Sequence, residues 1–238
     1  MSLRINTNVA ALNAYNNLNA NQTSLNNAFS QLSSGLRINK AADDASGLAI
    51  SQGLTSQING LTQAVSNAQD ATNVAQIADG ALGTTQSILQ RMRTLVVQSG
   101  NTGTQDSASL GDIQAEITAL NSQLDSISSS TKFGSTALLD GSYSGVFQVG
   151  ATSDPSDQIT LTLAGSDSAT LGTDAVDVTT AASFATNLTA IDGALSTVST
   201  ERAGIGATQN QLNYTVSNLQ TGITNVTASR SNLTDADL

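Results

Sequence analysis

A seven-residue apolar repeat constrains the fold of this chain more than any other feature of its sequence. Every seventh position between residues 54 and 96 is apolar: Leu54, Leu61, Ala68, Ala75, Leu82, Leu89 and Val96. Such a repeat keeps one stripe of a helix facing a partner helix along its whole length. At about 1.5 Å per residue this helix is roughly 65 Å long, so the sequence predicts an elongated bundle and excludes a compact globule.

Two further apolar ladders predict the partners of this helix. One steps by three and four from Leu110 to Ile127, and the other steps by four and three from Phe184 to Leu233. Residues 3–34 carry a thinner stripe on a segment rich in Asn and Gln. A helix with so little apolar surface needs partners to be stable, so we expect this segment to be disordered in a free monomer.

The period of the pattern changes after Lys132. Residues 146–149 and 159–163 alternate apolar and polar side chains, as half-buried strands do, and residues 153–157 form a turn between them. The predicted fold is therefore mainly α with a small β region. We expect an elongated, antiparallel, coiled-coil-like bundle of long helices with a β-hairpin region at the far tip.

A short linker separates the first helix from the long one. Gly35 ends the first helix, and residues 36–42 contain Arg37 and Lys40. Asp43 and Asp44 come directly before the long helix, where carboxylates cap free N–H groups. We expect these acids to cap the helix and to pair with Arg37 or Lys40. A cation site there would lack a third ligand.

Composition excludes several classes of function. The chain has no His and no Cys, which removes the commonest general base, the thiol nucleophile and the soft metal ligands. We therefore expect no enzyme activity, no metal and no cofactor. Residues 104–180 carry ten acids against one Lys, which argues against a nucleic-acid partner. No apolar run approaches the roughly 20 residues of a membrane span, and the N-terminus lacks a secretory signal.

Several long motifs point to one family. They are Ile5–Asn8, residues 33–51 (SSGLRINKAADDASGLAIS), residues 89–99 (LQRMRTLVVQS), residues 112–117 (DIQAEI), residues 201–210 (ERAGIGATQN) and Asn218–Leu219. In this order they resemble the signatures of bacterial flagellins over residues 1–140 and 184–238.

The resemblance implies a subunit that polymerises with itself into the flagellar filament for motility. In flagellins the terminal helices build an inner tube and the long helices an outer tube. The implied division is 1–43 for the N-terminal inner-tube helix and linker, 44–140 for the long-helix bundle, 141–181 for the hairpin region, 182–230 for the returning helix and 231–238 for the start of a C-terminal inner-tube segment. The apolar positions of the implied polymerisation helix are Ile5, Val9, Leu12, Leu18, Leu25, Phe29 and Leu32.

The resemblance also implies partners and a location. Flagellins are exported unfolded, with an export apparatus, a chaperone and a filament cap as partners, and they form an extracellular filament. They are recognised by an innate immune receptor of the toll-like class. The matching positions are Gln90, Arg91, Leu95, Gln98 and Glu116. The alternative is purely structural: Leu95 packs internally, and Arg91 forms a surface ion pair with Glu116 worth under about 1 kcal/mol.

One departure from the family leaves other readings open. The chain ends at Leu238, where the family continues with a further helix, so we expect a short form without its C-terminal terminal helix. The alternatives are a hook–filament junction protein of the same export system, or an engineered, truncated, soluble receptor agonist.

Overall fold

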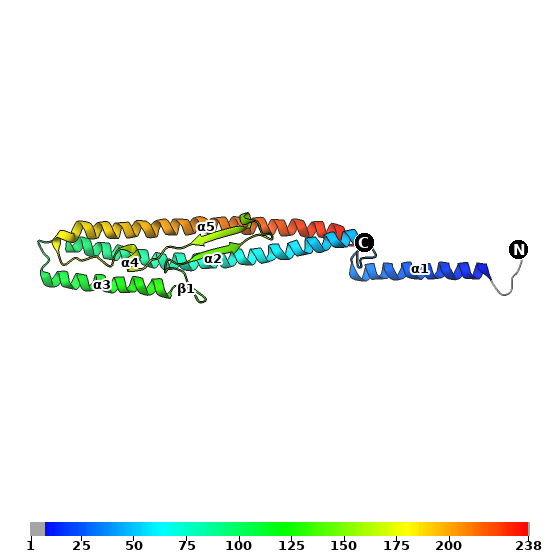
Figure 1. Ribbon diagram of the computed structural model, residues 1–238, viewed down its shortest axis with the longest axis horizontal. Helices are drawn as coiled ribbons and strands as arrows, with labels where there is room; N and C mark the ends of the chain where they lie inside the picture. The colour runs from blue at the N-terminus through cyan, green and yellow to red at the C-terminus, as the bar shows by residue number, and fades with distance from the viewer. Residues whose placement is uncertain (1–7, 238) are drawn as a thin grey trace. The chain divides into compact units, whose positions relative to one another are not determined.

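The computed structural model describes residues 8–237, which are mostly helical (Figure 1). The α-helices are α1 (Val9–Ser34), α2 (Ala45–Ser99), α3 (Ser107–Ser130), the single turn α4 (Ser168–Leu171) and α5 (Phe184–Thr234). The strands are β1 (Lys132–Phe133), β2 (Thr136–Ala137), β3 (Ser144–Gln148) and β4 (Gln158–Thr162). Two 3₁₀ turns cover Pro155–Asp157 and Ala181–Ser183.

The chain divides into two compact units. One contains the residues up to Gly60 together with those from Thr221 onward, and the other contains Leu61–Gln220. The long helices α2 and α5 each contribute to both units. The five-part division inferred from the family resemblance is a finer one, and it stays a prediction.

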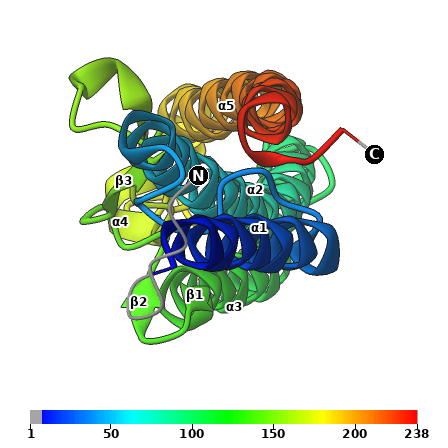
Figure 2. The same ribbon diagram turned by 90° about the vertical axis from the view of Figure 1, so that its right-hand side faces the viewer.

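The core of the second unit confirms the seven-residue repeat. Within this unit, α2, α3 and α5 run alongside one another (Figures 1 and 2). The repeat positions Ala68, Ala75, Leu82, Leu89 and Val96 are all buried, with exposed fractions of 0–1%. Around the last four of them pack Ile117 and Leu124 of α3 and Ile191, Val198 and Ile205 of α5. The stripe that the spacing predicted is therefore the surface on which the three helices meet.

The hairpin does not lie at the far tip of the bundle, which corrects one part of the prediction. Strands β3 and β4 pair antiparallel, with Ser144 opposite Thr162 and Gln148 opposite Gln158. Ile159 of β4 is buried in a cluster with Ala71 of α2 and Leu212 of α5. Ala71 is about 40 Å along α2 from the turn at its C-terminal end. The alternating pattern gives each strand an apolar face, and small alanines on α2 leave room for it beside the helices.

Asp106 caps the N-terminus of α3, and its charge makes the stability of the fold depend on pH. Its Oδ1 accepts a hydrogen bond from the main-chain N–H of Ser109 at an N–O distance of 2.8 Å. This bond holds the pKa of the Asp106 carboxyl below its ordinary value. A lowered pKa in the folded state stabilises the fold above the unfolded pKa of about 4, and this contribution is lost as the pH falls through the folded pKa.

We predict that Asp106→Asn is less stable than the wild type at pH 7 and that this difference becomes smaller as the pH falls to 3. Asparagine still caps a helix, so the difference isolates the charge. Urea unfolding followed by circular dichroism at both pH values measures the difference in free energy of unfolding. A difference that does not change between pH 7 and pH 3 would contradict the assignment.

Candidate functional site

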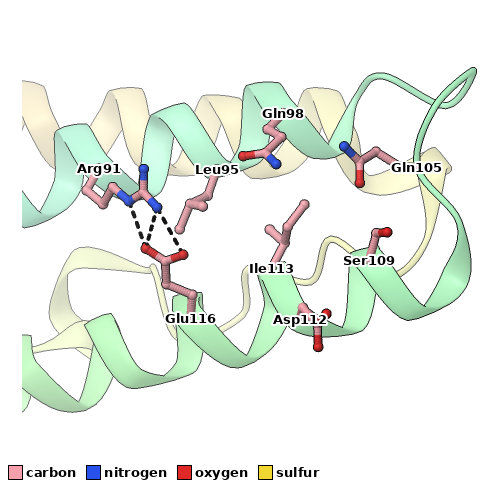
Figure 3. A pocket seen from close by; sticks show the side chains of 8 residues that line it. All are labelled: Arg91, Leu95, Gln98, Gln105, Ser109, Asp112, Ile113 and Glu116. Atoms are coloured by element: carbon pink, nitrogen blue, oxygen red, sulfur yellow. Dashed lines mark hydrogen bonds and ion pairs between the residues drawn. The ribbon is translucent and has the colours of Figure 1, made fainter.

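An open groove lies between α2 and α3 in the second unit (Figure 3). Its volume is about 340 Å³. Its lining residues are Arg91, Leu95 and Gln98 of α2, Gln105 of the connecting turn, and Ser109, Asp112, Ile113 and Glu116 of α3. The spacings of four and three place each set on one face of its helix. The short turn after α2, closed by the Asp106 cap, brings the two faces together.

An ion pair closes one end of the groove. The Arg91 Nε lies 2.7 Å from Glu116 Oε1, and Nη2 lies 3.0 Å from Oε2, so the guanidinium binds the carboxylate through two nitrogens (Figure 3). The two side chains are 51% and 42% exposed. At this exposure the pair contributes under about 1 kcal/mol to stability. Arg91 and Glu116 therefore remain at the surface, where another molecule can reach them.

The groove has an apolar floor. Leu95 is 1% exposed and Ile113 is 6% exposed, and both belong to the core of the second unit. The purely structural reading of Leu95 is therefore correct in this structure: the side chain packs internally. Gln98 is exposed and lines the groove, whereas Gln90 is exposed on α2 but is not among the lining residues.

The groove contains four residues that the family resemblance did not assign to the receptor surface. They are Gln105, Ser109, Asp112 and Ile113. The sequence held a signal for three of them, since Ser109, Asp112 and Ile113 precede Glu116 by seven, four and three residues, on the same helix face. Gln105 belongs to a turn, and only the fold brings it to the groove.

The linker before α2 forms a second cluster, in the first unit. Asp44 caps α2, and its Oδ1 accepts from the main-chain N–H of Gly47 at 2.8 Å. A Cβ at residue 47 would lie 2.7 Å from Ile38 Cδ1 and would also meet the Asp44 carboxylate, so a larger residue there would displace both side chains. Asp43 Oδ2 accepts from the main-chain N–H groups of Asn39 and Lys40.

The expected pairing of these acids with Arg37 or Lys40 is wrong. Arg37 Nη2 donates to the main-chain oxygen of Leu233 at 2.7 Å, and Lys40 Nζ donates to Asn27 Oδ1 at 3.1 Å. The ion pairs found among residues 8–237 include neither base. The last carbonyls of a helix have no partner within it and attract a cation, so the end of α5 competes successfully for Arg37.

The main chain of the linker is also bonded to the end of α5. Arg37 N donates to the Thr234 oxygen at 2.7 Å, and Ala236 N donates to the Gly35 oxygen at 2.9 Å. Leu36 and Asp235 form an antiparallel bridge, and Gly35 has a positive φ of 68°. We call these bonds, together with the Arg37 side-chain bond to Leu233, the linker clamp.

Helix α1 exposes its apolar side chains. Val9, Leu12, Leu18, Leu25, Phe29 and Leu32 are 51–63% exposed, and no residue of α1 is buried. Ile5 lies outside the described residues. In the described part of the chain, no helix is long and apolar enough to cross a membrane. No group of three acidic, His or Cys side chains there is placed to hold a metal ion.

Comparison with known proteins matches both ends of the chain to one family. The family model for the bacterial flagellin N-terminal helical region matches residues 5–144, and that for the C-terminal helical region matches residues 188–238. Since the C-terminal region is matched, the expected short form without a terminal helix is not confirmed and stays a prediction.

Three individual proteins illustrate the similarity. A flagellin of Bacillus subtilis is 42% identical over 99% of this chain and 88% of its own length. The crystal structure of Bacillus cereus flagellin is 30% identical with a TM-score of 0.56, covering 65% of this chain and 88% of that one. A putative flagellar hook-associated protein from Vibrio parahaemolyticus has a TM-score of 0.62 over 81% of this chain and its own full length. At 18% identity, this last likeness shows the fold alone.

The linker clamp generates a test by hydrogen exchange. We predict that Arg37→Ala raises the amide exchange rate at residues 35–37 and 234–236 by at least about fivefold, because a hydrogen bond from a charged group contributes about 1.5–3 kcal/mol. Lys40→Ala is the matched control, since Lys40 is a neighbouring base that bonds to α1. If the clamp amides exchange at the same rate in Arg37→Ala and Lys40→Ala, the Arg37 side chain does not anchor the linker clamp.

Proposed function

Because the chain belongs to the bacterial flagellin family, we propose that α1 is the helix through which its copies polymerise. Flagellins are structural proteins of the extracellular flagellar filament, and this chain is a filament subunit of that family. The proposal concerns which surface of the chain makes the contacts between copies.

The exposure of α1 carries this proposal. Seven large hydrophobic side chains on one 26-residue helix, Tyr15 included, are more than half exposed, which is costly in water unless another surface covers them. Residues 5–36 contain no charged side chain. Identical copies can therefore pack along α1 without bringing like charges together, while Asn and Gln remain able to hydrogen-bond.

The route to the filament is part of the same proposal. We infer export in an unfolded state through a flagellar export apparatus, with a chaperone before export and a cap at the growing tip. Family membership supports these partners and a secreted location.

We predict that Phe29→Ser lowers incorporation into growing flagellin filaments at least about tenfold. Burying one large apolar side chain contributes about 1.5–3 kcal/mol. Co-sedimentation of the labelled chain with filaments measures incorporation. Asn17→Ser is the control, because Asn17 is exposed and only Asn and Ala lie three or four residues from it. Because Phe29 is 61% exposed, thermal unfolding should be unchanged in both variants. Equal incorporation of the two would remove Phe29 from the contact.

A second candidate function is recognition by an innate immune receptor of the toll-like class. The groove between α2 and α3 favours it, since Arg91, Gln98 and Glu116 present charged and polar groups around an apolar floor. Arginine beside buried apolar surface is a common anchor of protein interfaces. Gln90 extends the surface along α2, and Leu95 contributes by supporting the groove from below.

We predict that Arg91→Ala weakens binding to the receptor ectodomain at least about tenfold, the loss of one interface anchor. Arg93→Ala is the matched control. Arg93 is a neighbouring exposed arginine of α2, and its Nε is bonded to Asp192 Oδ1 at 2.7 Å. Surface plasmon resonance compares the two variants with the wild type. Equal affinities for both variants would remove Arg91 from the receptor site.

The alternatives from the sequence remain distinguishable. A hook–filament junction protein would occupy one ring of copies per flagellum, whereas a filament subunit is found along the length, so immunogold labelling separates the two. An engineered soluble receptor agonist would bind the receptor without joining filaments. The segment Arg91–Ser99 and the Asp-Ala-Asp motif at residues 235–237 favour the filament subunit.

A further inference from the structure

The apolar contacts between α2 and α5 in the second unit do not by themselves fix the register, that is, the position of α5 along α2. Two rows of α2 repeat every seven residues and face the core: Ala68, Ala75, Leu82, Leu89 and Val96, and Ala71, Ala78, Thr85 and Met92. The facing row of α5 also repeats every seven residues: Ile191, Val198, Ile205, Leu212 and Leu219. If one helix slid by seven residues, almost every apolar contact would become another apolar contact, and only side-chain sizes would change.

Arg202 interrupts the neighbouring row of α5. This row is half-buried; Leu188, Leu195 and Val216 are its apolar members, and Gln209 is its other polar one. A charged group at a seam position costs stability but can specify register. The buried Thr85 of α2 cannot do so, because its hydroxyl has no hydrogen-bond partner within the described structure.

The bonds of Arg202 reach two points on α2. Its Nε lies 2.8 Å from Asp79 Oδ1, and its Nη1 lies 2.6 Å from Gln86 Oε1. The guanidinium lies over Gly83, where an added Cβ would be 3.8 Å from Arg202 Cζ. Asp79 and Gln86 are two helical turns apart, with Gly83 providing space between them. We propose that Arg202, held between Asp79 and Gln86, fixes the register of α5 against α2.

The neighbouring sequence makes a slip unfavourable in both directions. A slip of seven residues one way would place Arg202 between Gln86 and Arg93, where two like charges meet. A slip the other way would place it between Thr72 and Asp79, where the shorter Thr72 side chain replaces the amide oxygen of Gln86. Only the observed register gives the guanidinium a carboxylate and a side-chain amide oxygen two helical turns apart.

A second cross-helix pair provides the control. Arg93 of α2 bonds Asp192 of α5 in the same register, but through a single nitrogen, and its side chain is 46% exposed. Removing it should leave the register intact. Fixing the register also places the hairpin, because β4 packs against Ala71 of α2 and Leu212 of α5 together.

Distance measurements between spin labels test the proposal in the full chain. The protein has no Cys, so Gln69→Cys and Thr197→Cys, both at exposed positions, accept labels specifically. With Arg202 over Gly83, the labels are separated along the helices by about 28 Å. We expect one distance in the wild-type background and in Arg93→Met. Arg202→Met should add a population shifted by about 10 Å, one seven-residue step.

Further variants keep the test decisive. Arg202→Lys keeps the charge but offers a single point donor, so it should show a smaller shifted population. If Arg202→Met does not fold, Gln86→Met removes only one acceptor and should show the same shift at lower population. A single unchanged distance in Arg202→Met, or in Gln86→Met if the first is unfolded, would overturn the proposal. The register would then be fixed at the start of α5, where Asn187 Nδ2 donates to the Asp177 oxygen at 2.6 Å.

Discussion

The burial of one stripe of α2 is the interaction on which the second unit depends. Five residues spaced by seven, from Ala68 to Val96, are almost fully buried. At the start of the stripe, small alanines leave room for the hairpin to pack against α2. Further along, leucines fill the space between α2, α3 and α5. The same α2 that forms this core also presents Arg91 and Gln98 to the groove from its other face. The groove is therefore held in place by the core beneath it.

Charged residues are few, and several arginines form contacts between helices or between the linker and a helix end. Arg91 and Arg93 connect α2 to α3 and α5, Arg202 connects α5 back to α2, and Arg37 binds the end of α5. Long uncharged stretches elsewhere leave the helix surfaces to Asn, Gln, Ser and Thr. In a protein whose family assembles into filaments, this arrangement limits repulsion between copies while keeping each fold specific.

The sequence predicted the long helices well, because a ladder sustained over several repeats leaves little choice of structure. It also predicted the caps Gly35 and Asp44, because a cap acts on main-chain groups only a few residues away. The partners of Arg37 and Lys40 were mispredicted. Nearby acids were the obvious candidates in sequence, and the carbonyl of Leu233, 196 residues away, became available only through the fold.

The amino-acid sequence by itself determined that the chain forms long helices, which faces of them are apolar, and which family its motifs resemble. These properties depend on local spacing. The tertiary structure decided where the hairpin packs, that Leu95 lies beneath the groove while Arg91 remains at the surface, and which residues on α2 receive Arg202. A repeat of seven is nearly unchanged by a shift of seven, so the sequence could predict the stripe but not the register.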